Sequence, residues 1–173
     1  NSLQGGGVYV STEGNFTMSG GTITGCKSSS LGSGIYTLGK LNISGSAVID
    51  SNKPSDWDSI SYTDGYPQVK SGGVYGGGIY ALGENAIINM SGGRISNNWA
   101  PSGAGVMLWV GSTMTMTGGE ISGNYALGTG GLGNGGAVYV EYSTFTLTVA
   151  VPCAFNAVER LSVVCVYGVP SYD

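Results

Sequence analysis

The densest group of acidic and aromatic side chains in the chain lies between Ser51 and Gly73. Two carboxylates near a tryptophan are groups that can bind a sugar, hold calcium, or act as the acid and nucleophile of a glycoside hydrolase. The alternative is a solvated polar loop. The residues in question are Asp56, Trp57, Asp58, Tyr62, Asp64 and Tyr66.

Four further acids fall on repeats that would stack close enough to this segment to join it: Asp50, Glu84, Glu120 and Glu141. Loops that leave a repetitive scaffold on one face commonly carry its function. The candidate catalytic residues are therefore Asp56, Asp58, Asp64, Glu84, Glu120 and Glu141. Calcium is the one cofactor that these carboxylates suggest, and no other cofactor is expected.

Tyrosines recur at the centres of short aliphatic triplets. If the flanking residues face inward, the tyrosines form an outward ladder broken only by Met107. Exposed stacked tyrosines suit the apolar faces of sugar rings, although such a ladder also stabilises a sheet by itself. With the other candidate aromatic residues, the expected ligand-binding set is Tyr9, Tyr36, Tyr80, Tyr139, Trp57, Tyr62, Tyr66 and Trp109.

Charge and composition exclude several classes of protein. The chain has 10 acidic and 6 basic residues, a net charge of −4, and no run of basic residues, so nucleic-acid binding is not expected. It has no histidine, and its three cysteines lack metal-ligand spacing, so neither a structural zinc site nor a histidine general base is expected. Cys153 and Cys165 either form a disulfide, leaving Cys26, or all three are small buried residues.

The elements that must position these residues are repeats. Five imperfect copies begin at Gly5, Gly32, Gly76, Gly103 and Gly135, and each holds short runs of alternating apolar and polar residues between glycine-rich corners. This period of two predicts β-strands, and a copy of this size can bury its apolar face only by stacking on its neighbours. We therefore predict an all-β parallel β-helix, a solenoid of about five coils with three short strands each.

Alignment of the copies predicts which residues stack. Two inward columns are expected in the middle strand, namely Phe16, Leu41, Ile88, Met114 and Phe145, and Met18, Ile43, Met90, Met116 and Leu147. In the third strand, Ile23, Val48, Ile95 and Ile121 should continue the core. Two polar ladders should face outward, namely Thr17, Asn42, Asn89, Thr115 and Thr146, and Ser19, Ser44, Ser91, Thr117 and Thr148.

Two finer features follow from the same alignment. Arg94 and Glu120 fall on neighbouring copies, which predicts an exposed ion pair worth at most about 1 kcal/mol. The Ser/Thr-Gly-Gly triplets after the middle strands mark corners that need positive φ or close backbone approach. Residues 1–149 thus form the repeats, with an inserted loop at 51–73, and residues 150–173 form a cap or irregular segment without a transmembrane span.

The motifs GGGVYV from Gly5 and FTMSGGTI from Phe16, followed by a Gly/Asn pair, resemble glycine-rich repeats of bacterial surface and secreted proteins. Those repeats belong to the right-handed parallel β-helix, or pectin-lyase-like, superfamily. The resemblance covers about residues 5–149 and implies the right-handed fold. It carries over no catalytic residue, because no calcium-binding acids followed by a catalytic arginine or lysine are present.

Three functions are consistent with these patterns. The first is a non-catalytic extracellular or cell-surface module, a monomer or a fragment of a longer surface protein, that contacts polysaccharide or a host-surface glycan. The second is a carbohydrate-active enzyme, a glycoside hydrolase or polysaccharide lyase, that uses the candidate carboxylates. The third, suggested by the outward threonines, is an ice-binding protein, although asparagine and serine interrupt the array.

Overall fold

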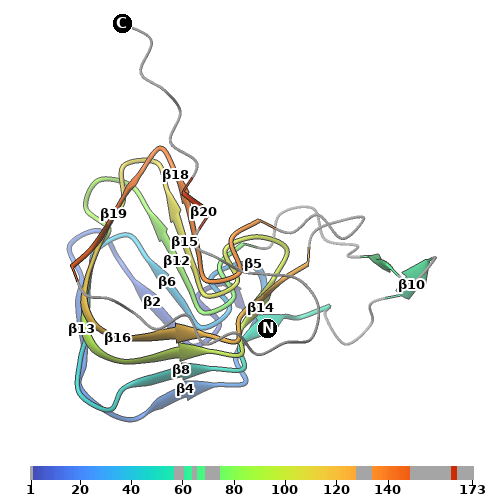
Figure 1. Cartoon of the computed structure of the whole chain (residues 1–173), viewed down its shortest axis with the longest axis horizontal. Coiled ribbons are helices and arrows are strands. Elements are labelled where there is room, and N and C mark those ends of the chain that lie inside the picture. The colour runs from blue at the N-terminus through green and yellow to red at the C-terminus, as the bar shows by residue number, and fades with distance from the viewer. Residues whose placement is uncertain are drawn as a thin grey trace, which may run out of the picture.

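The computed structural model of the chain describes residues 2–56, 61–63, 66–68, 75–127, 134–148 and 165–166. These residues contain strands and turns and no helix, as expected from the period of two. Figure 1 shows strands from successive repeats lying side by side around a common interior. Apart from one hairpin, the pairings are parallel, an arrangement compatible with the expected β-helix.

Three groups of parallel strands surround the interior. The first sheet contains β2 (Val8–Val10), β6 (Ile35–Thr37), β12 (Ile79–Leu82), β15 (Val106–Trp109), β18 (Val138–Glu141) and β20 (Cys165–Val166). The second sheet contains β3 (Asn15–Met18), β7 (Lys40–Ile43), β13 (Ile87–Ser96), β16 (Thr113–Ser122) and β19 (Thr144–Leu147), with β4 (Thr22–Thr24) and β8 (Val48–Asp50) at one end. The third group contains β1 (Ser2–Gln4), β5 (Lys27–Leu31) and β9 (Lys53–Pro54), and the pair β14 (Trp99–Ala100) and β17 (Tyr125–Ala126).

The inserted segment and the C-terminal segment each contribute strands. An antiparallel hairpin joins β10 (Ser61–Thr63) to β11 (Tyr66–Gln68) within the insertion. Strand β20 pairs in parallel with β18, at the end of the first sheet where a cap was expected. The predicted pairing of Cys153 with Cys165 lies outside the described side chains, and Cys26 is free.

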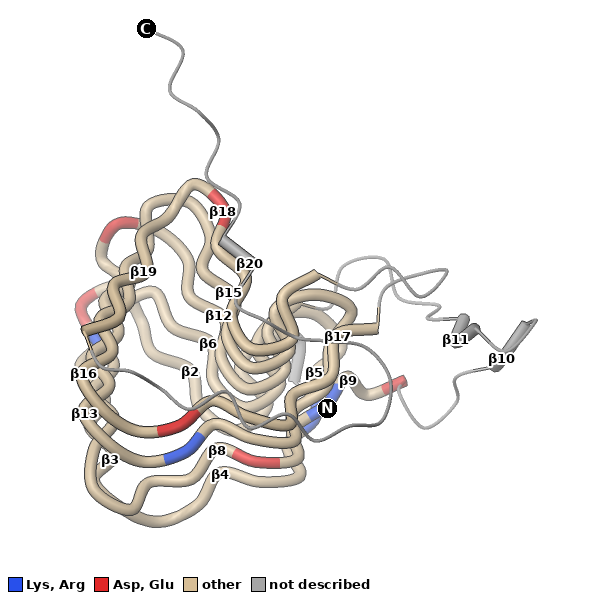
Figure 2. The backbone as a smooth tube through the Cα atoms, in the orientation of Figure 1, with Lys and Arg blue, Asp and Glu red and all other residues tan. Residues whose placement is uncertain are grey.

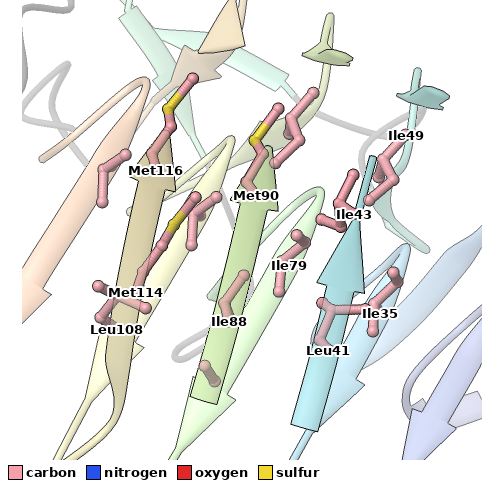
Figure 3. Close-up of a cluster of buried hydrophobic side chains, with 14 of the residues drawn as sticks. Ile35, Leu41, Ile43, Ile49, Ile79, Ile88, Met90, Leu108, Met114 and Met116 are labelled. Atoms are coloured by element: carbon pink, nitrogen blue, oxygen red, sulfur yellow. The ribbon is translucent and has the colours of Figure 1, made fainter. Parts of the chain in front are cut away.

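The predicted register of the middle strands is confirmed. Leu41 pairs with both Phe16 and Ile88, and Met90 pairs with both Ile43 and Met116. The inner members of these columns are fully buried, and Figure 3 shows Leu41, Ile43, Ile88, Met90, Met114 and Met116 projecting from neighbouring strands into one cluster. Only Leu147, at the end of its column, is largely exposed. The first polar ladder faces outward between these columns in the predicted register, with Asn89 beside Asn42 and Thr115. The second ladder, which follows the columns, was predicted wrongly at one step: the register shifts after Met90, so Ser91 pairs with Gly118 and not with Thr117.

The predicted core of the third strand is wrong by one residue in the second repeat. Ile49, and not Val48, pairs with Ile23 and Ile95 and is fully buried. The second repeat has four residues between its outward Ser44 and this core position, whereas the other repeats have three. The extra residue is accommodated in the corner, where Ala47 is buried and its carbonyl accepts a hydrogen bond from the Arg94 N–H.

The predicted pairing of Arg94 with Glu120 is correct in register but not as an ion pair. The two residues are neighbours on β13 and β16, yet both side chains are exposed and no ion pair joins them in the described part of the chain. The positive charge of Arg94 acts instead on Asp50, one strand away. The corner glycines behave as predicted, with φ of 80° at Gly21, 82° at Gly93 and 94° at Gly119.

A buried polar column follows the third strands and was not predicted. The side chains of Asn52, Asn98 and Asn124 stack inside the corner, with Nδ2 to Oδ1 distances of 2.9 Å from Asn52 to Asn98 and 3.0 Å from Asn98 to Asn124. Each Nδ2 also donates to a backbone carbonyl, and the Oδ1 of Asn52 accepts from the Cys26 N–H. These bonds satisfy buried polar groups that would otherwise destabilise the corner.

The substitution Met90→Asp tests the buried column. It places an unpaired charge beside Ile43 and Met116, at a cost comparable to the whole stability of a small domain, so we expect loss of cooperative thermal unfolding. Asn89→Asp, at the next and outward position, is the control and should unfold cooperatively. Similar melting of the two variants, followed by circular dichroism, would contradict this arrangement.

Candidate functional site

The tyrosine ladder forms in the predicted register on the outer side of the first sheet. Tyr36 pairs with Tyr9 and Tyr80, and Met107 lies between Tyr80 and Tyr139. The rings stack with centroid distances of 5.5 Å for Tyr9 and Tyr36 and 5.6 Å for Tyr36 and Tyr80. This spacing follows from the distance between adjacent strands.

The expectation that the ladder is exposed is wrong for its central rings. Tyr36 and Tyr80 are only 4% and 5% exposed, and Met107 is fully buried, whereas Tyr9 is 52% exposed. The ladder forms a second hydrophobic cluster, separate from the main core, and six partly buried apolar residues pack against it: Leu31, Leu38, Tyr75, Leu82, Trp109 and Tyr139. The sequence pattern gave the direction of the tyrosines but not the residues that cover them. A sugar could reach Tyr9 but not the middle of the ladder.

Burial also changes the acidity of these tyrosines. Desolvation, followed by the charges of Tyr36, Tyr75 and Glu141, raises the pKa of Tyr80 to about 12. Desolvation, followed by the charge of Tyr9, raises the pKa of Tyr36. At the end of the ladder, the hydroxyl of Tyr139 donates to Oε2 of Glu141 at 2.9 Å. These features are those of a packed structural cluster.

The candidate carboxylates are divided among three places in the fold. Glu84, in the turn after β12, and Glu141, at the end of β18, lie at the exit of the first sheet. Glu120 is exposed on the second sheet, and the half-buried Asp56 follows β9. Figure 2 shows the acidic segments, in red, spread around the described tube. Asp58 and Asp64 lie outside the described residues, as does Trp57, and for Tyr62 and Tyr66 only the backbone strands are described.

Asp50 belongs to a structural network at the end of β8. Burial raises the pKa of its carboxyl, but hydrogen bonds from Ser51, Ser96 and Asn97 and the charge of Arg94 outweigh that effect, so the pKa is lowered. The three donors lie 2.6, 2.7 and 2.9 Å from its oxygens. The described residues contain no group of three or more side chains suited to hold a metal ion.

A column of outward side chains follows the buried asparagines and was missed by the sequence analysis. The backbone N–H groups of Lys53, Trp99 and Tyr125 donate to the carbonyls of Cys26, Asn52 and Asn98, at 3.1, 2.9 and 2.8 Å. The same bond thus recurs three times, and Lys53 also pairs in register with Lys27. We call Lys27, Lys53, Trp99 and Tyr125 the corner column.

The corner column ends in an exposed aromatic pair. The rings of Trp99 and Tyr125 stack with a centroid distance of 4.5 Å and an interplanar angle of 20°. Tyr125 is 46% exposed and Trp99 is half-buried. Trp99, Lys27 and Lys53 also take part in further interactions. The column lies beside the start of the insertion, because β9 is formed by the first residues of that segment.

The signal for this column is present in the sequence. A lysine or an aromatic residue directly follows the last corner residue of four repeats, in the pairs Cys26-Lys27, Asn52-Lys53, Asn98-Trp99 and Asn124-Tyr125. Extending the alignment of the repeats by one residue beyond this last corner residue would have placed all four side chains in one column.

Comparisons with family models, curated proteins and solved structures found no match to the chain. Among the described residues, no helix is long and apolar enough to cross a membrane.

The raised pKa of Tyr80 predicts how stability depends on pH. Because the folded chain holds this proton more tightly than the unfolded chain, whose tyrosines ionise at about pH 10, the stabilisation is complete below that pH. It should be lost as the pH rises towards about 12. Tyr80→Phe keeps the ring but not the proton, so its free energy of unfolding should fall less steeply over this range. Denaturant unfolding at a series of pH values measures this free energy, with the exposed Tyr142→Phe as control. If the free energy of unfolding of Tyr80→Phe and of the unmodified chain fell equally with pH, the phenol of Tyr80 would not be buried.

Proposed function

We propose that the chain is a non-catalytic binding module, extracellular or at a cell surface, that contacts polysaccharide or a host-surface glycan. Its scaffold is a right-handed parallel β-helix of about five coils, one for each sequence repeat. The contact surface is the corner column, which includes Lys53 at the start of the insertion. The stack of the exposed Tyr125 on the half-buried Trp99 is the observation that carries this proposal.

The chemistry of the aromatic pair supports a sugar ligand. Aromatic rings offer apolar area to the C–H faces of pyranose rings, while a tyrosine hydroxyl can exchange hydrogen bonds with sugar hydroxyls. Trp99 supports one face of Tyr125 at 4.5 Å, which limits the orientations of the tyrosine ring before a ligand arrives. A preoriented ring loses less conformational entropy on binding.

The position of the pair on the scaffold supports the same function. Both residues lie in strands whose backbones are bonded to the neighbouring repeats, and the buried Asn98 and Asn124 directly precede them. The site is thus built on rigid elements, as binding sites require. The insertion meets the same column at Lys53, and its sequence continues with further aromatic residues and acids, among them Trp57 and Asp58.

The substitution Tyr125→Ala tests the aromatic contact. Removing the exposed ring should weaken binding to the best ligand of an immobilised polysaccharide panel by about tenfold, equivalent to about 1.4 kcal/mol. Tyr142→Ala is the matched control, because this tyrosine is 67% exposed in the turn after β18 and lies outside the corner column. Equal affinities of the two variants would overturn the assignment of the surface.

The non-catalytic part of the proposal has its own test. The unmodified chain is incubated with the same polysaccharides, and reducing ends and unsaturated products are measured. We expect none to accumulate. Turnover that is lost in Asp58→Asn would establish the carbohydrate-active enzyme instead.

A further inference from the structure

The repeats begin with a common backbone arrangement. The residues directly before the first glycines of four repeats pair with one another in isolated parallel bridges, and we call them the entrance column: Leu31, Tyr75, Ser102 and Asn134. The glycines that follow them all have a positive φ, between 60° and 69°. The N–H groups of Gly32, Gly76 and Gly103 donate to the entrance-column carbonyl of the next repeat, at 3.0, 3.2 and 2.9 Å.

The last repeat lacks this hydrogen bond. The carbonyl of Asn134 accepts from the N–H of Gly103, so the backbone of Asn134 is held against the preceding repeat. Gly135 has no further repeat beyond it, and no carbonyl of the described part of the chain accepts its N–H. The amide nitrogen of Gly135 is therefore not engaged as the equivalent nitrogens of the other repeats are.

The side chain next to this nitrogen is an exposed asparagine amide. Asn134 and Gly135 form the only Asn-Gly pair of the sequence. The Cγ of an asparagine can reach the nitrogen of the next residue and close a five-membered ring, and a following glycine has no Cβ to obstruct that approach. The other described asparagines are all followed by residues with a side chain, and the amides of Asn98 and Asn124 are also held in buried hydrogen bonds.

We propose that Asn134 is a site of spontaneous modification, at which the nitrogen of Gly135 converts the asparagine into aspartate and isoaspartate. The Gly135 nitrogen loses its proton to hydroxide and forms a bond to Cγ of Asn134. The bond from Cγ to Nδ2 breaks, and Nδ2 leaves as ammonia with a proton from water, which restores the hydroxide. This inference goes beyond the proposed function and does not depend on it.

Water then opens the cyclic imide at one of its two carbonyl carbons. Opening at Cγ restores the ordinary main chain with an aspartate, whereas opening at the backbone carbon leaves the main chain running through Cγ as isoaspartate. Both products add a negative charge at the end of the entrance column. Isoaspartate also lengthens the main chain by one methylene at the bridge between Ser102 and Asn134, which should disturb the pairing of the last repeat.

Ageing of the full chain at mildly alkaline pH tests the proposal. Ion-exchange chromatography separates the more acidic products, and peptide mapping by mass spectrometry locates them. We expect conversion at Asn134 before any other described asparagine, at a rate that rises with pH because the nitrogen reacts in its deprotonated form. Asn134→Gln is the control, because its longer side chain needs a six-membered ring and should convert far more slowly. No conversion at Asn134, or earlier conversion at another described asparagine, overturns the proposal.

The substitution Ser102→Asn tests the part played by the missing hydrogen bond. It creates a second Asn-Gly pair at the equivalent position, where the following Gly103 is buried with a φ of 61°, as Gly135 is with a φ of 60°. Only the N–H of Gly103 is bonded to the next repeat. Conversion at position 102 should be about tenfold slower than at Asn134 in the same molecules, equivalent to about 1.4 kcal/mol, which is close to the net contribution of one hydrogen bond.

The same variant in denaturant is the reference, because unfolding frees both nitrogens. We expect similar rates at the two positions there. Similar rates in the folded variant would show that the dipeptide alone decides, and a tenfold difference that persists in denaturant would assign it to the neighbouring sequence. Either result overturns the proposal.

Hydrogen exchange tests the same point in the freshly prepared chain without a substitution. The N–H of Gly103, which is bonded at 2.9 Å, should exchange more slowly than the N–H of Gly135. Equal protection of the two N–H groups overturns the proposal, because the Gly135 nitrogen would then be as firmly held as its equivalents.

Discussion

Parallel pairing of equivalent residues is the constraint on which the rest of the structure depends. Each of the middle strands β7, β13 and β16 is bonded on both sides by the corresponding strand of another repeat, so every outward or inward position is repeated along a column. A residue is therefore placed beside its own equivalents, and whatever suits a column must suit most of its members. Apolar side chains meet this condition inside, as Leu41, Ile88 and Met114 do.

The same constraint governs the polar residues. A buried amide can donate to the next amide and accept from the previous one, so Asn52, Asn98 and Asn124 satisfy each other at a corner where single polar groups would be costly. Charges lack this complementarity, which explains why only 9% of the residues are charged. Lys27 and Lys53 depart from this rule, and both take part in further interactions of the chain.

The sequence predicts the parts of the fold that periodicity controls. The two inward columns, the first outward polar ladder and the register of Arg94 with Glu120 follow from alignment of the repeats. Alignment failed at Val48, because one extra residue in a corner shifts a strand by a full side-chain alternation. It also failed to show that Tyr36 and Tyr80 are covered. The residues that pack against their cluster, among them Tyr75 and Trp109, occupy other positions of the repeat and come close only in the folded chain. The aromatic corner pair could have been found from the recurring Asn-Trp and Asn-Tyr pairs, but its exposure could not.

Disulfide trapping tests the stacking of repeats most directly. Asn42 and Asn89 are in-register neighbours 47 positions apart, and their outward side chains are joined by a hydrogen bond of 3.1 Å, so cysteines at both positions should form a disulfide under mild oxidation. Cysteines at Asn42 and Thr146, on the same ladder but three strands apart, should not be linked within one molecule. Peptide mapping by mass spectrometry that finds the 42 to 89 bond and no intramolecular 42 to 146 bond supports the account; equal yields of the two bonds, or neither bond, would contradict it.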